Sequence, residues 1–97
     1  MRVLRKNPGE PWEAIEVENG LKPLQDAVGG YLESVTFAED ACILCDEEGR
    51  LKGRTYNATV CGVPFVGNIL VVGVDGENFS DLTEQQEAAL KEMGVLM

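Results

Sequence analysis

The fold is decided by the stretch Asn68-Ile69-Leu70-Val71-Val72-Gly73-Val74, which is the strongest strand signal in the chain. Aliphatic and β-branched residues follow one another here, and Asp75-Gly76 ends the run with a turn signal. The uninterrupted apolar part, residues 69–72, is far shorter than the roughly 20 residues of a membrane-spanning helix. We therefore expect a strand at residues 68–74, with a bulge or a close backbone approach at Gly73.

On the C-terminal side of this strand, the sequence predicts a helix that begins after Thr83. Thr83 and Gln86 have the spacing of a capping box, Lys91 lies in the last turn, and Gly94 follows it. The few apolar positions of this helix favour packing on the surface of a sheet. The apolar tail Val95-Leu96-Met97 is predicted to fold back on its own sheet or to bury in a second protomer.

Towards the N-terminus, alternating and periodic apolar residues predict four strands and one helix before the central segment. The predicted elements are strands at 1–5 and 12–18, a helix from Leu21 that stops at Gly29, and strands at 31–37 and 41–45. The first two strands are expected to form an N-terminal hairpin. The fold predicted for residues 1–97 is a single α+β domain: a small, mixed, mainly antiparallel sheet, a short helix after strand 2 and a C-terminal helix.

The segment between the two halves is predicted to reverse the chain and then to become irregular. Asp46-Glu47-Glu48-Gly49 has the acidic residues and the glycine of a hairpin turn, whose acids are interpreted as solvated. Residues 51–56 are then expected to return as a strand. The breakers that follow predict irregular backbone at Gly62, Pro64 and Gly67.

The charge of the chain indicates which kinds of partner it can bind. A net charge of −9, from 17 acidic and 8 basic side chains, repels a phosphate backbone at long range, so broad nucleic-acid binding is not expected. Positive charge is nevertheless local, because six of the eight cations lie in two short segments: Arg2, Arg5 and Lys6, then Arg50, Lys52 and Arg54. The second segment lies inside the region predicted to return as a strand.

Several kinds of reactive centre are excluded or disfavoured by the residues present. The chain has no histidine and no GxxxxGK[ST] phosphate loop, which removes histidine-based triads and nucleotide hydrolysis of that type. Cys42 and Cys45 have CxxC spacing, but residues three apart on a strand point to opposite faces. We therefore predict buried structural cysteines, no metal and no cofactor. Three widely spaced cysteines and no signal peptide predict a cytoplasmic protein with reduced thiols and no membrane contact.

A family resemblance rests on the central segment and its surroundings. Glu47-Glu48-Gly49-Arg50-Leu51-Lys52-Gly53, followed by Asn57, is similar to Glu-Glu-Gly-Lys/Arg-Leu-x-Gly-x-x-x-Asn, the core of domain of unknown function family 3846. Residues 24–33 and 77–83 resemble further segments of that family in the same order. Family members often carry an arginine after the asparagine, where this chain has Ala58. The resemblance implies a small protein of bacteria, phages or mobile elements, from a family without a settled activity.

A candidate ligand site follows from the cations of the central segment. The candidate ligand-binding residues are Arg50, Lys52, Arg54, Tyr56, Asn57 and Tyr31. On a strand, the three cations share one face. Tyr56 lies on the same face, and Asn57 is the next residue along the chain. Guanidinium groups bind phosphate, tyrosine stacks on bases and asparagine hydrogen-bonds to base edges. The alternative interpretation is that the cations only offset the acids of the preceding turn, in surface pairs worth about 0–1 kcal/mol each.

Three functions stay open at this point. The first is a non-enzymatic phage or mobile-element protein that binds and sequesters a small phosphate-bearing ligand, such as a nucleotide-derived signal of host defence. Its site is expected to be shared within a homodimer or a higher homo-oligomer, because a domain of this size rarely encloses a nucleotide alone. The second is an acidic inhibitor that docks on a host protein by mimicking a nucleic acid. The third is a small enzyme that uses carboxylates to act on a nucleotide.

Overall fold

The predicted strand around residue 70 is the central strand of the sheet. The computed structural model describes residues 1–96, and in it β7 (Ile69–Asp75) is buried from its first residue to Gly73. The main sheet has the order β2-β1-β7-β4-β3, every neighbouring pair is antiparallel, and β8 also pairs with β7. The other strands are β1 (Arg2–Lys6), β2 (Glu13–Glu16), β3 (Leu32–Ala38), β4 (Ala41–Asp46) and β8 (Asn78–Ser80). The N-terminal hairpin and the mainly antiparallel α+β fold are confirmed.

Both predicted helices form, and each is held by its own end signals. α1 (Leu21–Val28) buries Leu24 and Val28, and Gly29 ends it in the left-handed conformation at φ 85°. α2 (Glu84–Glu92) begins with the predicted capping box of Thr83 and buries Leu90. Within residues 1–96, neither helix combines the length and the apolar character needed to cross a membrane.

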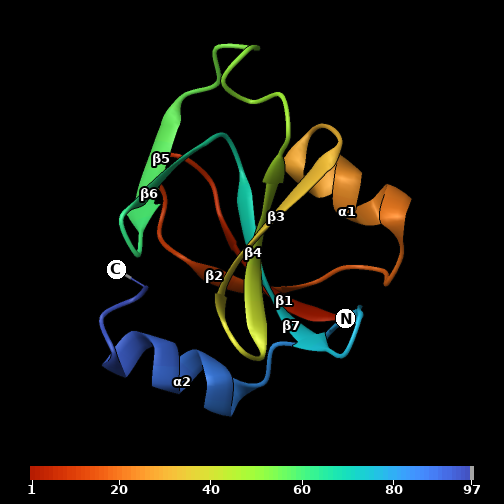
Figure 1. The fold of residues 1–97 in the computed structure, drawn as a ribbon, viewed down its shortest axis with the longest axis vertical. Coiled ribbons are helices and arrows are strands. Elements are labelled where there is room, and N and C mark those ends of the chain that lie inside the picture. The colour runs from red at the N-terminus through yellow and green to blue at the C-terminus, as the bar shows by residue number, and fades with distance from the viewer. Residues whose placement is uncertain (97) are drawn as a thin grey trace.

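The main sheet has an apolar core on each of its faces, because successive strand residues point in opposite directions. On one face, α1 packs over Val3, Cys42, Leu44, Leu70 and Val72. On the other, Leu4, Ile43, Cys45, Ile69 and Val71 pack against Val60, Phe65, Leu82, Leu90 and Leu96. Figure 1 shows α1 on one side of the sheet and a two-stranded hairpin with α2 on the other. The sheet is therefore covered by α1 on one face and by the hairpin and α2 on the other.

The C-terminal tail folds back on its own chain. Leu96 is buried in the core beneath α2, and Val95 packs against the same cluster. This confirms the first of the two predicted outcomes for residues 95 and 96, while Met97 lies outside the described residues.

Two predictions for the central segment are wrong. Residues 51–53 form turns and residues 54–55 have no regular structure, so Arg50, Lys52 and Arg54 do not share the face of a strand. Residues 56–66 form a hairpin, β5 (Tyr56–Val60) with β6 (Val63–Val66), where irregular backbone was expected after residue 61. Cys61 and Gly62 both have positive φ, at 50° and 81°, as a two-residue hairpin turn requires. Pro64 is tolerated because β6 has only one partner strand.

Candidate functional site

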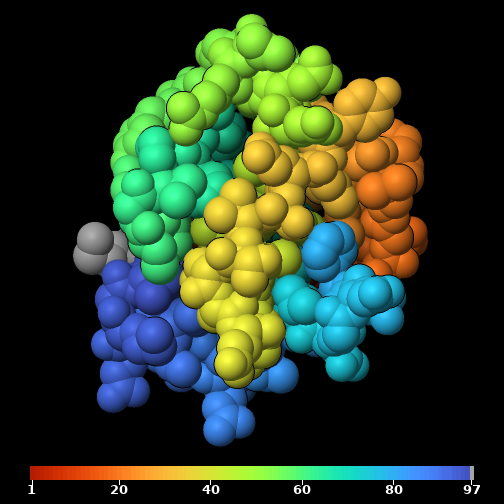
Figure 2. All heavy atoms as spheres, viewed as in Figure 1, coloured from red at the N-terminus to blue at the C-terminus, as the bar shows by residue number. Residues whose placement is uncertain are grey.

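A buried carboxylate organises the loop of residues 47–55, which forms the yellow-green top of the molecule in Figure 2. The side chain of Asp46 has no exposed surface, and its Oδ2 accepts hydrogen bonds from Lys52 Nζ at 2.9 Å and Arg54 Nε at 2.7 Å. Its Oδ1 accepts a third from the backbone N–H of Glu48 at 2.9 Å. We call these three side chains, Asp46, Lys52 and Arg54, the Asp46 clamp.

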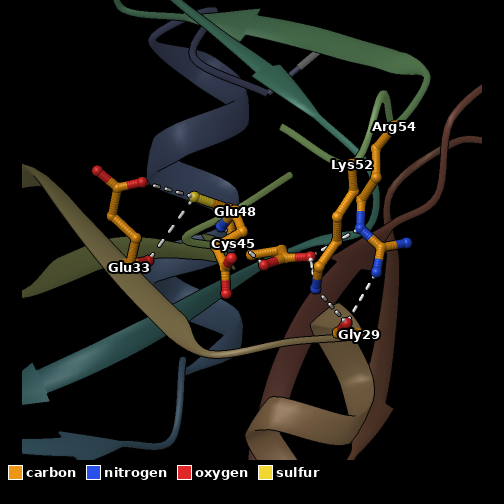
Figure 3. A network of polar contacts seen from close by, with 7 residues as sticks. Gly29, Glu33, Cys45, Glu48, Lys52 and Arg54 are labelled. Carbon is orange, nitrogen blue, oxygen red and sulfur yellow. Dashed lines mark hydrogen bonds and ion pairs between the residues drawn. The ribbon is translucent and has the colours of Figure 1, made fainter. Parts of the chain in front are cut away.

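The Asp46 clamp also ties the loop to the end of α1. Arg54 Nη2 donates to the carbonyl oxygen of Gly29 at 2.8 Å, and Lys52 Nζ approaches the same oxygen at 3.4 Å. Figure 3 shows both side chains pointing towards this carbonyl. Helix C-termini favour cations because their last carbonyls lack helical partners. Two of the three predicted ligand-binding cations are thus engaged inside the protein, as the alternative interpretation held, although their carboxylate is buried rather than solvated.

The hydrogen bonds of the clamp change the acidity of Asp46. Burial raises its pKa, but hydrogen bonds from Lys52, the Glu48 N–H and Arg54 outweigh burial and lower the pKa from 3.8 to about 2. The ionised carboxylate is therefore the form that the native loop requires at neutral pH.

We expect stability to fall as the pH drops from about 4 to about 2, because the unfolded chain takes up a proton in that range before the native Asp46 does. The pKa difference corresponds to about 2 kcal/mol of unfolding free energy, present above pH 4 and lost below pH 2. Urea unfolding between pH 2 and 6 measures it. The Asp46→Asn variant should lose this part of the pH dependence, and an unchanged profile in that variant would contradict the assignment.

The six predicted ligand-binding residues do not form one site. Arg50 donates to the carbonyl of Pro64 at 3.0 Å and lines a cavity of about 310 Å³ that the acidic residues Glu33, Asp46 and Glu47 also line. Lys52 and the exposed Tyr31 line a second cavity of about 380 Å³ near the end of α1. Tyr56 and Asn57 line a third cavity. Arg54 lines none of the five cavities described. The prediction required the strand at residues 51–56, which does not form.

Asn57 is a structural residue in this fold. Its side chain is buried, and its Nδ2 donates to the carbonyl oxygens of Lys6 at 2.8 Å and Gly67 at 2.7 Å. Its Oδ1 accepts from Lys6 Nζ at 2.9 Å. The two bonds with Lys6 join the start of the β5–β6 hairpin to the end of β1, and the bond to Gly67 joins it to the residue that follows β6. The amide therefore has no N–H left for reading a base.

The third cavity, which we call the Lys6 cavity, lies beside this amide and has a volume of about 540 Å³. The residues that matter for its chemistry are Lys6, Trp12, Tyr56, Asn57, Thr59 and Met93. Lys6 is only 9% exposed, and no carboxylate among residues 1–96 pairs with its ammonium group. Of the five cavities described, this one alone is lined by a cation without a carboxylate.

Sequence reasoning noted Lys6 only as part of a basic segment. One signal in the sequence could have identified it: on β1 the residue lies two positions after Leu4, which is fully buried, and so shares the inward face. A lysine in phase with a core leucine is a candidate for a buried charge. Its partner Asn57 lies 51 residues further along the chain and cannot be identified from that pattern.

The three cysteines differ in exposure. Cys42 and Cys45 are buried in the cores on opposite faces of the sheet, which confirms the interpretation of the CxxC spacing. Burial raises the pKa of Cys42 to about 11, and burial with the nearby charges of Glu33 and Asp46 raises that of Cys45 to about 11. Both thiols are therefore protonated at neutral pH and poor nucleophiles. Cys61 is exposed at the β5–β6 turn and lines the Lys6 cavity.

Comparison with known proteins places the chain in a family. Comparisons with curated proteins and with solved structures found no match. The model of the family described as Domain of unknown function (DUF3846) matches residues 1–94 of the 97-residue chain, which includes the Glu-Glu-Gly-Arg-Leu-Lys-Gly segment and all ten helices and strands. The protein therefore belongs to the family Domain of unknown function (DUF3846), as the resemblance of its central segment predicted.

Proposed function

We propose that this protein binds and sequesters a small phosphate-bearing ligand in the Lys6 cavity and returns it unchanged. The observation that supports the proposal is the buried ammonium group of Lys6, which has an amide neighbour but no carboxylate among residues 1–96. This site replaces the one predicted on residues 50–57. The kind of ligand is the same, because an anion is the natural partner of an ammonium group.

The hydrogen bonds of Lys6 leave room for an anion. An ammonium group has three N–H donors, and in the described part of the chain only one is used, towards Asn57 Oδ1 at 2.9 Å. Burying a charge without a partner is costly, and a bound anion removes that cost. Among residues 1–96, Lys6 and Arg50 are the two cations that pair with no carboxylate, and Lys6 is the buried one, which ligand binding would explain in a chain with a net charge of −9.

The proposal includes binding without turnover. The chain has no histidine, no carboxylate of residues 1–96 lines the Lys6 cavity, and Cys61 is the one thiol among the described residues that lines it. General acid–base chemistry needs a group that exchanges protons near neutral pH beside the ligand. In a phage or mobile-element setting, which the family resemblance implied, such binding would withdraw a nucleotide-derived signal of host defence.

Replacing Lys6 with methionine is expected to weaken ligand binding about tenfold to hundredfold, because a hydrogen bond to a charged group is worth about 1.5–3 kcal/mol. Isothermal titration calorimetry with AMP, ATP, ribose 5-phosphate and inorganic phosphate measures the loss. Lys6→Gln, which keeps a donor for Asn57 without the charge, should lose binding similarly even if the methionine variant folds poorly. Lys22→Met is the matched control, because Lys22 is exposed, is paired with Asp26 and lines a different cavity.

The results separate the three functions. If no phosphate compound binds, or if both Lys6 variants bind normally, the proposal is wrong. Release of an altered compound after heating the loaded protein, identified by mass spectrometry, would contradict sequestration and favour a carboxylate-based enzyme. Capture of a host protein at low salt that is lost at high salt would favour the acidic inhibitor, since exposed charges are screened by salt.

A further inference from the structure

We infer that the ligand of the Lys6 cavity is a planar ring that carries a single anionic group, of the nucleoside monophosphate type rather than a polyphosphate. This inference rests on the proposed function and narrows its ligand class. Three features of the cavity support it: its single cation, its two aromatic side chains and its volume.

The first feature is the charge that the cavity can compensate. Lys6 is the one cation among the described residues that line it, and two N–H donors of its ammonium group have no protein acceptor in residues 1–96. A monophosphate or a carboxylate can accept both donors. The further phosphates of a diphosphate or triphosphate would meet no cation there, in a protein whose net charge of −9 repels them.

The second feature is a pair of aromatic residues, Trp12 and Tyr56, that line the cavity. Trp12 is half-buried and packs against the core, so its ring is held in place. Tyr56 is 57% exposed, and its hydroxyl is hydrogen-bonded to Thr59 Oγ1 at 2.9 Å within the same strand. Both line the cavity with Lys6. An aromatic face beside a cation recognises a ring that bears an anion, because stacking on an aromatic side chain suits any planar base.

The third feature is the size and the remaining boundary of the cavity. Its volume of about 540 Å³ is in the range of small-molecule sites, which is roughly 300–1,000 Å³. The segment that follows α2 contributes Met93, which is 72% exposed. Methionine is flexible and makes favourable contacts with aromatic rings. The cavity thus offers one polar end, at Lys6, and apolar and aromatic walls.

The test compares ligands that differ in ring and in charge. We expect AMP to bind at least about tenfold more tightly than ATP at low ionic strength. AMP should also bind about fivefold to a hundredfold more tightly than ribose 5-phosphate, since stacking is worth about 1–3 kcal/mol per base. Indole-3-acetate tests a carboxylate source of the same chemistry, and it should compete with AMP. Trp12→Leu should remove the preference for AMP over ribose 5-phosphate.

Variants and outcomes keep this inference separate from the proposed function. Tyr56→Leu provides a second ring variant if Trp12→Leu fails to fold, and Tyr31→Leu, an equally exposed tyrosine in another cavity, is the control. If ATP or ribose 5-phosphate binds as tightly as AMP while Lys6→Met still weakens binding at least about tenfold, the inference is overturned and the proposed function stands. If nothing binds, both fall. Competition between AMP and indole-3-acetate that depends on Lys6 supports the inference.

Discussion

Asp46→Ala is expected to lower the free energy of unfolding by about 2–4 kcal/mol. Removing one partner of a buried ion pair costs about 3–5 kcal/mol, and we reduce this figure because Lys52 and Arg54 are 40% and 33% exposed and regain water. The change also removes the acceptor for the Glu48 N–H, so the loop of residues 47–55 should be held less firmly to the end of β4, where the bond from the Gly49 N–H to the Asp46 carbonyl remains. Chemical denaturation measures the loss, and hydrogen exchange of residues 47–55 should report the loosened loop.

Two further variants, Asp46→Asn and Asp26→Ala, serve as comparisons for Asp46→Ala. Asp46→Asn keeps an oxygen for the Glu48 N–H and loses only the charge, so it should be less damaging than alanine. Asp26→Ala is the matched control, because Asp26 is 62% exposed in an i,i+4 pair with Lys22 and such pairs contribute about 0.3–0.5 kcal/mol. Equal effects of Asp46→Ala and Asp26→Ala would show that the Asp46 clamp does not hold the fold together.

Gly73→Ala is expected to destabilise the protein by about 3 kcal/mol, at the upper end of the cost of overpacking. A Cβ on Gly73 would lie 2.7 Å from Ser80 Oγ and closer still to the carbonyl oxygen of Asp81. That backbone has little freedom to move, because Asp81 Oδ1 accepts from the N–H of Arg2 and the N–H of Leu82 donates to the carbonyl of Arg2, both at 2.8 Å. The sequence-based prediction of a close backbone approach at Gly73 is confirmed.

The thermal midpoint of Gly73→Ala should fall by more than 10 °C, at about 4–8 °C per kcal/mol for a domain of this size. Gly20→Ala is the control, since a Cβ there meets only Pro23 at 3.5 Å, an ordinary contact. A midpoint for Gly73→Ala within a few degrees of the Gly20→Ala midpoint would mean that residues 80–82 yield to the new methyl group.

Local patterns account for the parts of the fold that the sequence predicts well. β4 and β7 are continuous apolar runs with buried side chains on both faces, and such runs are typical of central strands. α2 is identified by its capping box, which depends on residues three positions apart. These signals lie within a few residues of each other, so tertiary structure did not override them.

The candidate site depends on contacts that no local pattern contains. The acidic turn after β4 looks solvated, yet Asp46 is buried because the loop of residues 47–55 returns over it and supplies two cations. Likewise, Lys6 is enclosed because the β5–β6 hairpin places Asn57 against it. That hairpin itself was missed, since Cys61 is an unusual residue at positive φ and only Gly62 signals the turn.

The difference in exposure among the three cysteines offers a practical advantage. A maleimide fluorophore reacts with thiolates, and the two sheet cysteines are buried with pKa values near 11, so the native chain presents Cys61 as its single attachment point. Because Cys61 also lines the Lys6 cavity, the dye would sit beside the proposed ligand site. Labelled at Cys61, the unaltered amino-acid sequence is thus expected to report binding of the proposed ligand as a change in emission.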